Sequence, residues 1–260
     1  MHHPTSARRP AWRSLCAVLA PLLLLAAGLP ALAQAPELER MAVAGVADLR
    51  ARLEVVRVDG AAMRSISPDL AMLFGLKALD IAYKEPARFR AEARVGLLVI
   101  DGSTLYYRVP QLGIKRRTDL GADLHRRHSL FDLGLLTRAK LEQLEGRRLR
   151  SEALHGVAAE VFELRYRADR EVRYVAWLDP VRRVTLRRQW FDRSNRLKGT
   201  FDYLDVSEAA PGIFVPRKIE VRTAAGSLAG VAVYSDVVVN GGLADALFEL
   251  PADAPARPGG

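Results

Sequence analysis

One stretch, Leu79 to Val109, constrains the possible fold more than any other part of the chain. Apolar and polar residues alternate from Leu79 to Lys84, which is the period of a half-buried strand. The alternation stops at Pro86 and resumes from Phe89 to Val95. The sequence therefore predicts two successive strands with a break between them.

The second half of this stretch is apolar on both faces. Leu97 to Ile100 and Leu105 to Tyr107 flank Asp101-Gly102, a dipeptide typical of tight hairpin turns. Antiparallel sheets usually leave one face in water. A hairpin of this composition needs cover on both faces, and we expect a helix on one and a second layer, a lid or a ligand on the other.

The N-terminal residues have the pattern of a secretory signal peptide. Basic residues come first, then a leucine-rich apolar run, then small residues spaced as in a cleavage site: Arg8, Arg9 and Arg13, Leu15 to Leu29, and Ala31, Ala33 and Ala35. We predict a signal peptide over residues 1–33, cleavage after Ala33 or Ala35, and a periplasmic location. A retained membrane anchor is the alternative, although the run is short for a span of about 20 residues.

Cysteine content and charge limit the possible chemistry. The single cysteine, Cys16, lies inside the predicted signal peptide, so disulfides, thiolate metal sites and cysteine nucleophiles are excluded from the rest. The formal charge of +9 becomes +6 once Arg8, Arg9 and Arg13 are removed. A basic exported protein meets anionic lipid or acidic glycans rather than nucleic acid. A solvated basic surface explains the same charge.

Three segments are predicted to be helical. Pro36 to Val58 carries apolar residues close to helical spacing, and Asp59-Gly60 is expected to end that helix. Ser67-Pro68-Asp69 combines an N-cap, a proline in the first turn and an early acid, which predicts a short helix ending near Gly75. Phe131 to Gly146 has leucines on one face, and we expect it to cover one face of the sheet.

From Val157 onward the sequence predicts strands joined by short turns, with no βαβ rhythm. The strands are expected near residues 157–166, 174–178, 184–191, 197–206, 214–222 and 228–239. Leu247, Phe248 and Leu250 are expected to dock a short terminal segment, and residues 252–260 form a disordered tail. The fold class is mainly β with helices (α+β), a meandering antiparallel barrel or incomplete barrel.

Local patterns for catalysis or metal binding are weak. His125 and His128 are three residues apart, but no third ligand is placed nearby to complete a metal site. Ser129 and Asp132 lie beside His128, yet no G-x-S-x-G element accompanies them. We therefore expect no metal, no cofactor and no enzymatic activity, and an envelope esterase is the least favoured of the functions considered.

Several short motifs resemble the LolA-like superfamily, which includes the periplasmic lipoprotein carrier, the receptor LolB and related lipoprotein-sorting proteins. Each motif is weak, and their order and spacing carry the resemblance, which covers residues 36–251. They are an N-terminal amphipathic helix, Pro86-Ala87-Arg88-Phe89, Asp101 to Tyr107, Pro110, Trp177-Leu178-Asp179-Pro180, Val239 to Leu243 and Ala246 to Pro251.

The resemblance implies an incomplete antiparallel β-barrel under a helical lid, and a non-enzymatic carrier that holds acyl chains in an apolar cavity. One position departs from the family pattern. The lipoprotein carrier has an arginine immediately before the P-x-x-F proline, where this chain has Glu85. The role of that arginine in lid gating is therefore not carried over, which favours a relative with another amphiphile as cargo, or a stand-alone carrier, over the lipoprotein carrier itself.

Two sets of residues are candidate sites. The apolar lining is expected to comprise Leu98, Ile100, Tyr107, Trp177, Phe201 and Tyr203, although any one of these side chains also fits an ordinary core. The basic cluster Lys115, Arg116 and Arg117 is expected at the rim of the sheet, for contact with anionic lipid or a partner protein. The alternative function is an envelope regulatory or sensor module of the same fold, which docks a partner through this cluster.

Overall fold

The computed structural model describes residues 35–121 and 133–251. The predicted signal peptide, His125, His128 and the predicted tail lie outside these residues. Thirteen strands form one antiparallel sheet: β1 (Asp48–Val58), β2 (Ala78–Lys84), β3 (Arg88–Ala93), β4 (Gly96–Asp101), β5 (Thr104–Val109), β6 (Ile114–Asp119), β7 (Leu144–Leu154), β8 (Val157–Tyr166), β9 (Arg173–Asp179), β10 (Val184–Phe191), β11 (Leu197–Leu204), β14 (Lys218–Thr223) and β15 (Leu228–Val239). β12 (Ser207–Ala210) and β13 (Ile213–Val215) form a separate pair. The helical elements are α1 (Ala35–Glu39), α2 (Gly60–Ile66), α3 (Pro68–Gly75), η1 (Pro110–Leu112), α5 (Arg138–Glu142) and η3 (Asp245–Phe248).

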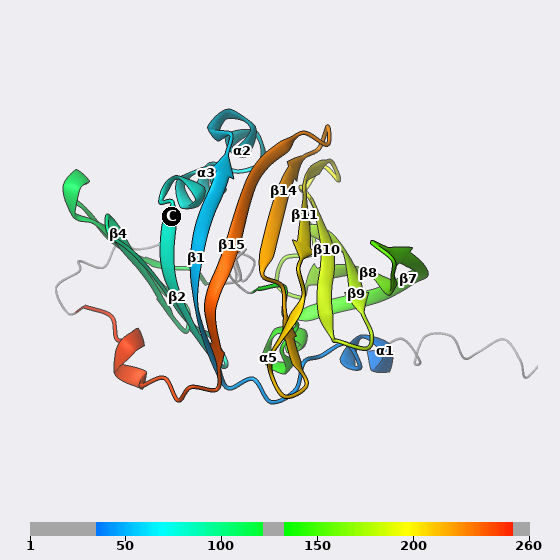
Figure 1. Ribbon diagram of the computed structural model, residues 1–260. Coiled ribbons are helices and arrows are strands. Elements are labelled where there is room, and N and C mark those ends of the chain that lie inside the picture. The colour runs from blue at the N-terminus through cyan, green and yellow to red at the C-terminus, as the bar shows by residue number, and fades with distance from the viewer. Residues whose placement is uncertain (1–34, 122–132, 252–260) are drawn as a thin grey trace, which may run out of the picture. The chain divides into compact units, whose positions relative to one another are not determined.

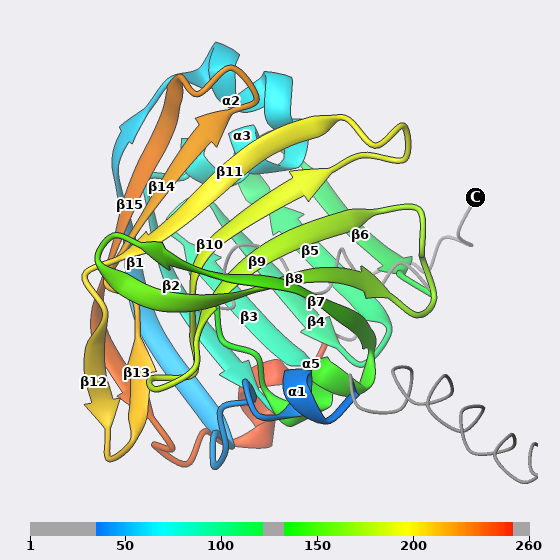
Figure 2. The same ribbon diagram turned by 90° about the vertical axis from the view of Figure 1, so that its right-hand side faces the viewer.

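The sheet runs β6-β5-β4-β3-β2-β1-β15-β14-β11-β10-β9-β8-β7. Strands β2 to β6 form one wing and β7 to β11 the other, and the two wings face each other across a strongly curved sheet (Figure 2). The edge strands β6 and β7 do not pair with each other among the described residues. The prediction of an incomplete antiparallel barrel with helices is therefore confirmed.

Register identifies the concave face, because directly opposed residues of an antiparallel pair share a face. Gly230 is opposed to Val221, and Val221 to Phe201, across β15, β14 and β11. A Cβ on Gly230 would lie 2.5 Å from Met63 Cε and 2.8 Å from the Phe74 ring. Helices α2 and α3 therefore pack directly on this face, behind the sheet in Figure 1.

The two helices have clear local signals. Ser67 caps α3 with its side-chain oxygen, which accepts from Leu70 N at 3.5 Å, and the helix ends at Gly75 as predicted. Asp59 caps α2, accepting from the backbone N–H groups of Ala61 and Ala62 at 3.0 Å. The expectation that Asp59-Gly60 ends a helix is wrong, because the Asp59 carboxylate satisfies the free N–H groups at a helix start.

The predicted helix over Pro36 to Val58 is also wrong. Only α1 is helical there, and β1 pairs on both sides with β2 and β15. Leu49 and Leu53 are 2% and 4% exposed, and they fit a strand period as well as a helix period. Pairing on both edges decides the outcome, since the backbone hydrogen bonds of β1 are made by two neighbouring strands.

The predicted helix over Phe131 to Gly146 is reduced to one turn, α5, capped by Thr137. Phe131 lies outside the described residues. Leu133 and Gly134 have φ values of 48° and 67°, which a helix does not allow. Gly146 is not a C-cap but lies inside β7, where a Cβ would collide with Leu38 of α1.

The convex face of β3, β4 and β5 is covered by the C-terminal segment, Leu243 to Pro251 (Figure 1). Val99 and Tyr106 are fully buried and oppose each other in register, and Phe248 of η3 is 1% exposed. The predicted docking of this segment is confirmed at Phe248. It also explains why the hairpin is apolar on both sides, since the chain itself provides the second cover.

Candidate functional site on the concave face

The wing β2 to β6 presents a continuous apolar row on its concave face. Register opposes Ile81 to Ala91, Ala91 to Leu98, and Leu98 to Tyr107. Ile81 is 3% exposed and Ala91 2%, while Leu98 and Tyr107 remain partly exposed. The row is thus buried near β1 and becomes accessible towards the sheet edge.

A second row runs beside the first. Ile100 is opposed to Phe89 on one side and to Leu105 on the other. Ile100 is 4% exposed, and Leu105 is partly exposed. The sequence analysis left out Leu105, although alternation from Tyr107 places both side chains on one face.

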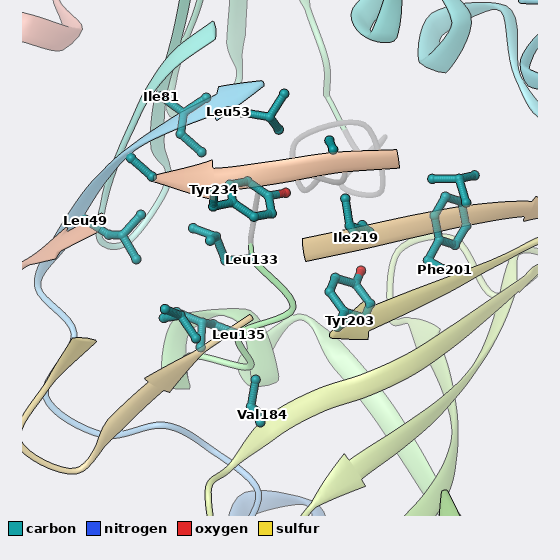
Figure 3. Close-up of a cluster of buried hydrophobic side chains, with 14 of the residues drawn as sticks. Leu49, Leu53, Ile81, Leu133, Leu135, Val184, Phe201, Tyr203, Ile219 and Tyr234 are labelled. Carbon is teal, nitrogen blue, oxygen red and sulfur yellow. The ribbon is translucent and has the colours of Figure 1, made fainter. Parts of the chain in front are cut away.

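The opposite wing contributes aromatic side chains. Phe201 and Tyr203 of β11 are 2% and 1% exposed and face the interior between the wings (Figure 3). Arg188 of β10 is opposed to Phe201, and its Cζ lies 5.6 Å from the Phe201 ring centroid and 5.9 Å from that of Tyr203. A guanidinium group therefore lies among aromatic rings, within the range of cation–π attraction.

A segment of the chain itself enters the space between the wings. Leu133 and Leu135 are 1% and 4% exposed and belong to the same cluster as Tyr203 and Leu49, as Figure 3 shows. The segment is anchored where Thr185 N donates to Gly134 O at 3.3 Å and Thr185 Oγ1 donates to the same oxygen. Ile100, Phe201 and Tyr203 therefore lie in an interior packed with the protein's own side chains, whereas Leu98 and Tyr107 stay partly exposed at its border.

Trp177 lies on the other face of the sheet from Phe201 and Tyr203. It is opposed to Arg187, which is opposed to Asp202. Arg187 and Arg150 lie over its ring, with Cζ at 5.8 and 5.9 Å from the centroid. Its Nε1–H donates to Glu152. The Arg150 guanidinium and then this indole N–H lower the pKa of Glu152. The structure brings five of the six candidate lining residues to one face.

A second apolar cluster lies on the wing formed by β7 to β11, where two helices cover it. Leu38 of α1 and Leu141 of α5 pack with Phe162 and Ala176. Ala176 is opposed to Arg188, so these helices cover the same face as α2 and α3. Figure 2 shows α1 and α5 at the lower end of the wings.

Strand alternation places the three residues of the basic cluster on two different faces of the sheet. Arg116 is opposed to Tyr107 on the concave face, and its Cζ lies 5.9 Å from the Tyr107 ring centroid. Arg117 is opposed to the buried Tyr106 on the convex face and donates to Pro251 O at 3.2 Å. Lys115 shares the convex side with Arg117 by alternation. Docking of a partner on all three residues stays a prediction, and only Arg116 borders the apolar rows.

Glu85 lies at the rim of the same face, where its carboxylate accepts a hydrogen bond of 2.6 Å from the Tyr83 hydroxyl. Among the described residues, no group of three or more histidine, cysteine, aspartate or glutamate side chains is arranged to hold a metal ion. No helix in that same part of the chain is long and apolar enough to cross a membrane. In the described part of the chain the concave face thus offers apolar surface, with the Arg188 guanidinium among its buried aromatic rings and the exposed Arg116 at its edge.

Comparison with known proteins places this geometry in a fold class. No family model matches the sequence, and no curated protein matches it. Several solved structures share the fold. A domain from Vibrio parahaemolyticus named as an outer membrane lipoprotein-sorting protein is 13% identical, with a TM-score of 0.56 over 83% of this chain and 94% of that one. A DUF1329 family protein from Desulfovibrio piger is 14% identical, with a TM-score of 0.57 over 83% and 94%.

The third structure is a LolA superfamily protein from Nitrosomonas europaea, 16% identical, with a TM-score of 0.53 over 84% of this chain and 98% of that one. Open antiparallel half-barrels with helices on the concave face are thus the class to which the fold belongs. More narrowly, the chain has a LolA-like fold, as the sequence motifs indicated. Identities this low establish the fold alone.

Proposed function

We propose that this chain is a non-enzymatic periplasmic carrier that binds the acyl chains of a lipoprotein or another amphiphile on its concave face. The observation that supports it is the pair of apolar rows on β2 to β5, which are buried near β1 but stay partly exposed at Leu98, Leu105 and Tyr107. An exposed apolar surface inside a curved sheet is suited to a hydrocarbon chain. The name of the Vibrio structure, which refers to lipoprotein sorting, agrees with this proposal.

The burial of an acyl chain on this face provides enough free energy for reversible binding. Each buried methylene group contributes about 0.8 kcal/mol, so about ten methylenes contribute roughly 8 kcal/mol before the costs of association. That corresponds to affinities no tighter than about micromolar, which suits a carrier that must release its cargo. The bound chain lies along β4 and β5, beside the space that Leu133 and Leu135 fill.

Arg116 gives the proposed site a polar end. Its guanidinium group is exposed and borders Tyr107, so an anionic headgroup can meet it while the acyl chain lies against Leu98. Guanidinium groups form strong charge-assisted hydrogen bonds with carboxylate and phosphate oxygens. An anionic amphiphile is therefore the expected class of cargo.

The test is titration of the purified chain with a fluorescent fatty-acyl probe, together with native mass spectrometry after mild purification. Leu98→Glu should weaken probe binding at least tenfold, because it places a charge in the apolar row. Val181→Glu is the matched control, since Val181 is 85% exposed in a turn. Probe binding that is absent in the unmodified chain, or equal in the two variants, would contradict the proposal.

A further inference from the structure

A polar pocket lies at the ends of β8 and β9 and at the turn after β10. Its volume is about 540 Å³, and it is lined by Glu163, Arg165, Arg170, Glu171, Arg173, Arg193 and Asn195. Four of these seven side chains are guanidinium groups and two are carboxylates. The lining therefore has an excess of positive charge and many N–H donors, since each arginine carries five.

This pocket is separate from the concave site. Arg165 is opposed to Arg173 in the β8–β9 register. Both alternate along their strands with Leu164 and Tyr174, which are opposed to each other and face the second apolar cluster under α1 and α5. The arginines thus lie on the opposite side of the sheet, and a ligand in the pocket does not compete with an acyl chain.

One carboxylate is shared by three guanidinium groups. Glu163 is 3.3 Å from Arg165, 3.6 Å from Arg173 and 3.7 Å from Arg147. The side chains of Glu163 and Arg173 are only 19% and 16% exposed. Solvent therefore screens the excess of positive charge around Glu163 less than it would at an open surface. An additional anion at this point would relieve the repulsion between the arginines.

The donors are held in place before any ligand arrives. The Arg173 Cζ lies 3.6 Å from the ring centroid of Phe191, and Arg173 Nε donates to Asn195 Oδ1 at 2.9 Å. The Asn195 amide oxygen is thereby used, which leaves its NH₂ group as a donor. Arg165 Nη1 donates to Arg170 O at 2.6 Å. Fixed side chains lose less conformational entropy on binding than mobile ones.

We propose that this pocket binds a phosphate-bearing anion, either a free phosphate compound or the headgroup of a phospholipid. A phosphate group presents several acceptor oxygens, and a guanidinium group can donate paired hydrogen bonds to two of them. The pocket volume exceeds that of a single phosphate group, so a diphosphate or a substituted phosphate fits. Glu171, which pairs with Arg193 at 3.1 Å, is the carboxylate that the anion displaces.

A closed network of internal ion pairs is the rival explanation. Arg193 also lies 3.7 Å from Asp169, and Arg170 donates to Glu145, so part of the positive charge is balanced within the chain. The two explanations predict different effects of removing the Glu171 carboxylate on anion affinity. A binding pocket gains anion affinity when the competing carboxylate is removed, whereas a purely structural network gains none.

The experiment is isothermal titration of the full chain with pyrophosphate, and flotation with phosphatidylcholine vesicles that contain phosphatidylglycerol. Arg165→Gln combined with Arg193→Gln should weaken pyrophosphate binding at least tenfold, and Glu171→Gln should strengthen it several-fold. Arg52→Gln is the control for the loss of an arginine elsewhere, because Arg52 pairs with Glu54 and Asp80 on strands away from the pocket. Unfolding midpoints of all variants show whether each is folded.

Arginine-dependent binding of pyrophosphate without vesicle binding assigns a soluble phosphate compound, and arginine-dependent vesicle binding assigns a lipid headgroup. Equal affinities across the three variants and the unmodified chain overturn the proposal, as does the absence of binding in both assays. Because probe binding on the concave face is measured separately, failure here leaves the proposed carrier function untouched.

Discussion

Lys84 and Asp245 are 161 positions apart in the chain and form an ion pair with 2.5 Å between Nζ and Oδ1. Arg88 approaches the same Oδ1 atom at 2.8 Å. These contacts hold the start of η3 on the convex face of β2 and β3. Farther along the segment, Arg90 Nη1 donates to Leu247 O at 3.2 Å. Lys84, Arg88 and Arg90 thus hold the first part of the C-terminal segment, and Arg117 of the same wing holds its end through Pro251 O.

The first prediction concerns this attachment. Asp245→Asn removes the charge that Lys84 and Arg88 share, so the C-terminal segment should open more often. Hydrogen exchange of residues 243–251 should become faster, while exchange in β15 stays unchanged. Asp236→Asn is the control, because Asp236 is exposed and its φ of 51° suits asparagine equally well. Equal exchange in the two variants would show that Phe248 packing alone holds the segment.

The second prediction is the pH dependence of the same attachment. The hydrogen bonds from Lys84 and then Arg88 hold the pKa of Asp245 below its ordinary value of 3.8. A carboxyl group whose folded pKa is lowered contributes its stabilisation above the unfolded value and loses it as the pH falls through the folded one. Protection of residues 243–251 should therefore persist at neutral pH and fall only under acid, below about pH 4. In Asp245→Asn this dependence should be weaker.

Much of the sheet was predictable because its signals are local. Alternation and turn residues identified β2 to β5 and β8 to β11, where Asp101-Gly102 is one of the turns. The cap at Ser67 identified α3 in the same way. The errors fall where a residue pattern fits two periods. Leu49 and Leu53 of β1 suit a helix or a strand, and the pairing with β2 and β15 that decides between them is non-local.

The candidate site was predictable in composition but not in orientation. Five of the candidate lining residues share the concave face, yet Trp177 faces away, because the β9–β10 register opposes it to Arg187 and places Ala176 on the concave face. Tyr174 to Leu178 is apolar throughout, so the sequence of β9 does not mark which of its residues face inward, and pairing with the neighbouring strands decides it. The sequence did not predict that Leu133 inserts between the wings, because the leucine spacing from Leu133 to Leu144 also fits a helix. The structure instead has a turn at Leu133.

The third prediction tests the close packing of α2 and α3 on the sheet. Gly230→Ala places a methyl group 2.5 Å from Met63 Cε and 2.8 Å from the Phe74 ring. Met63 can move its terminal methyl, but the Phe74 ring is attached to a packed helix. Overpacking of this kind costs about 1–3 kcal/mol, measurable as a lower urea midpoint at constant slope. Gly75→Ala is the matched control, since a Cβ there meets nothing within 4 Å. Equal midpoints would mean that the two helices are loosely held.

The fourth prediction asks whether Leu133 limits the space for cargo. Leu133 is 1% exposed between the wings, so Leu133→Ala removes buried methyl groups and should lower the free energy of unfolding by about 2–5 kcal/mol. The space that it leaves adjoins the apolar rows, so the variant should accept longer acyl probes than the unmodified chain does. Each additional buried methylene would add about 0.8 kcal/mol to the binding free energy. Affinities for a series of probes of increasing chain length measure this directly.

Leu141→Ala separates the loss of stability from the gain of cargo space, because Leu141 of α5 is also buried but belongs to the second cluster. It should lower stability comparably and leave the preferred probe length unchanged. If both variants shift that length equally, the change comes from general loosening, and Leu133 does not border the cargo. If only Leu133→Ala shifts it, the inserted segment sets the depth to which an acyl chain enters between the wings.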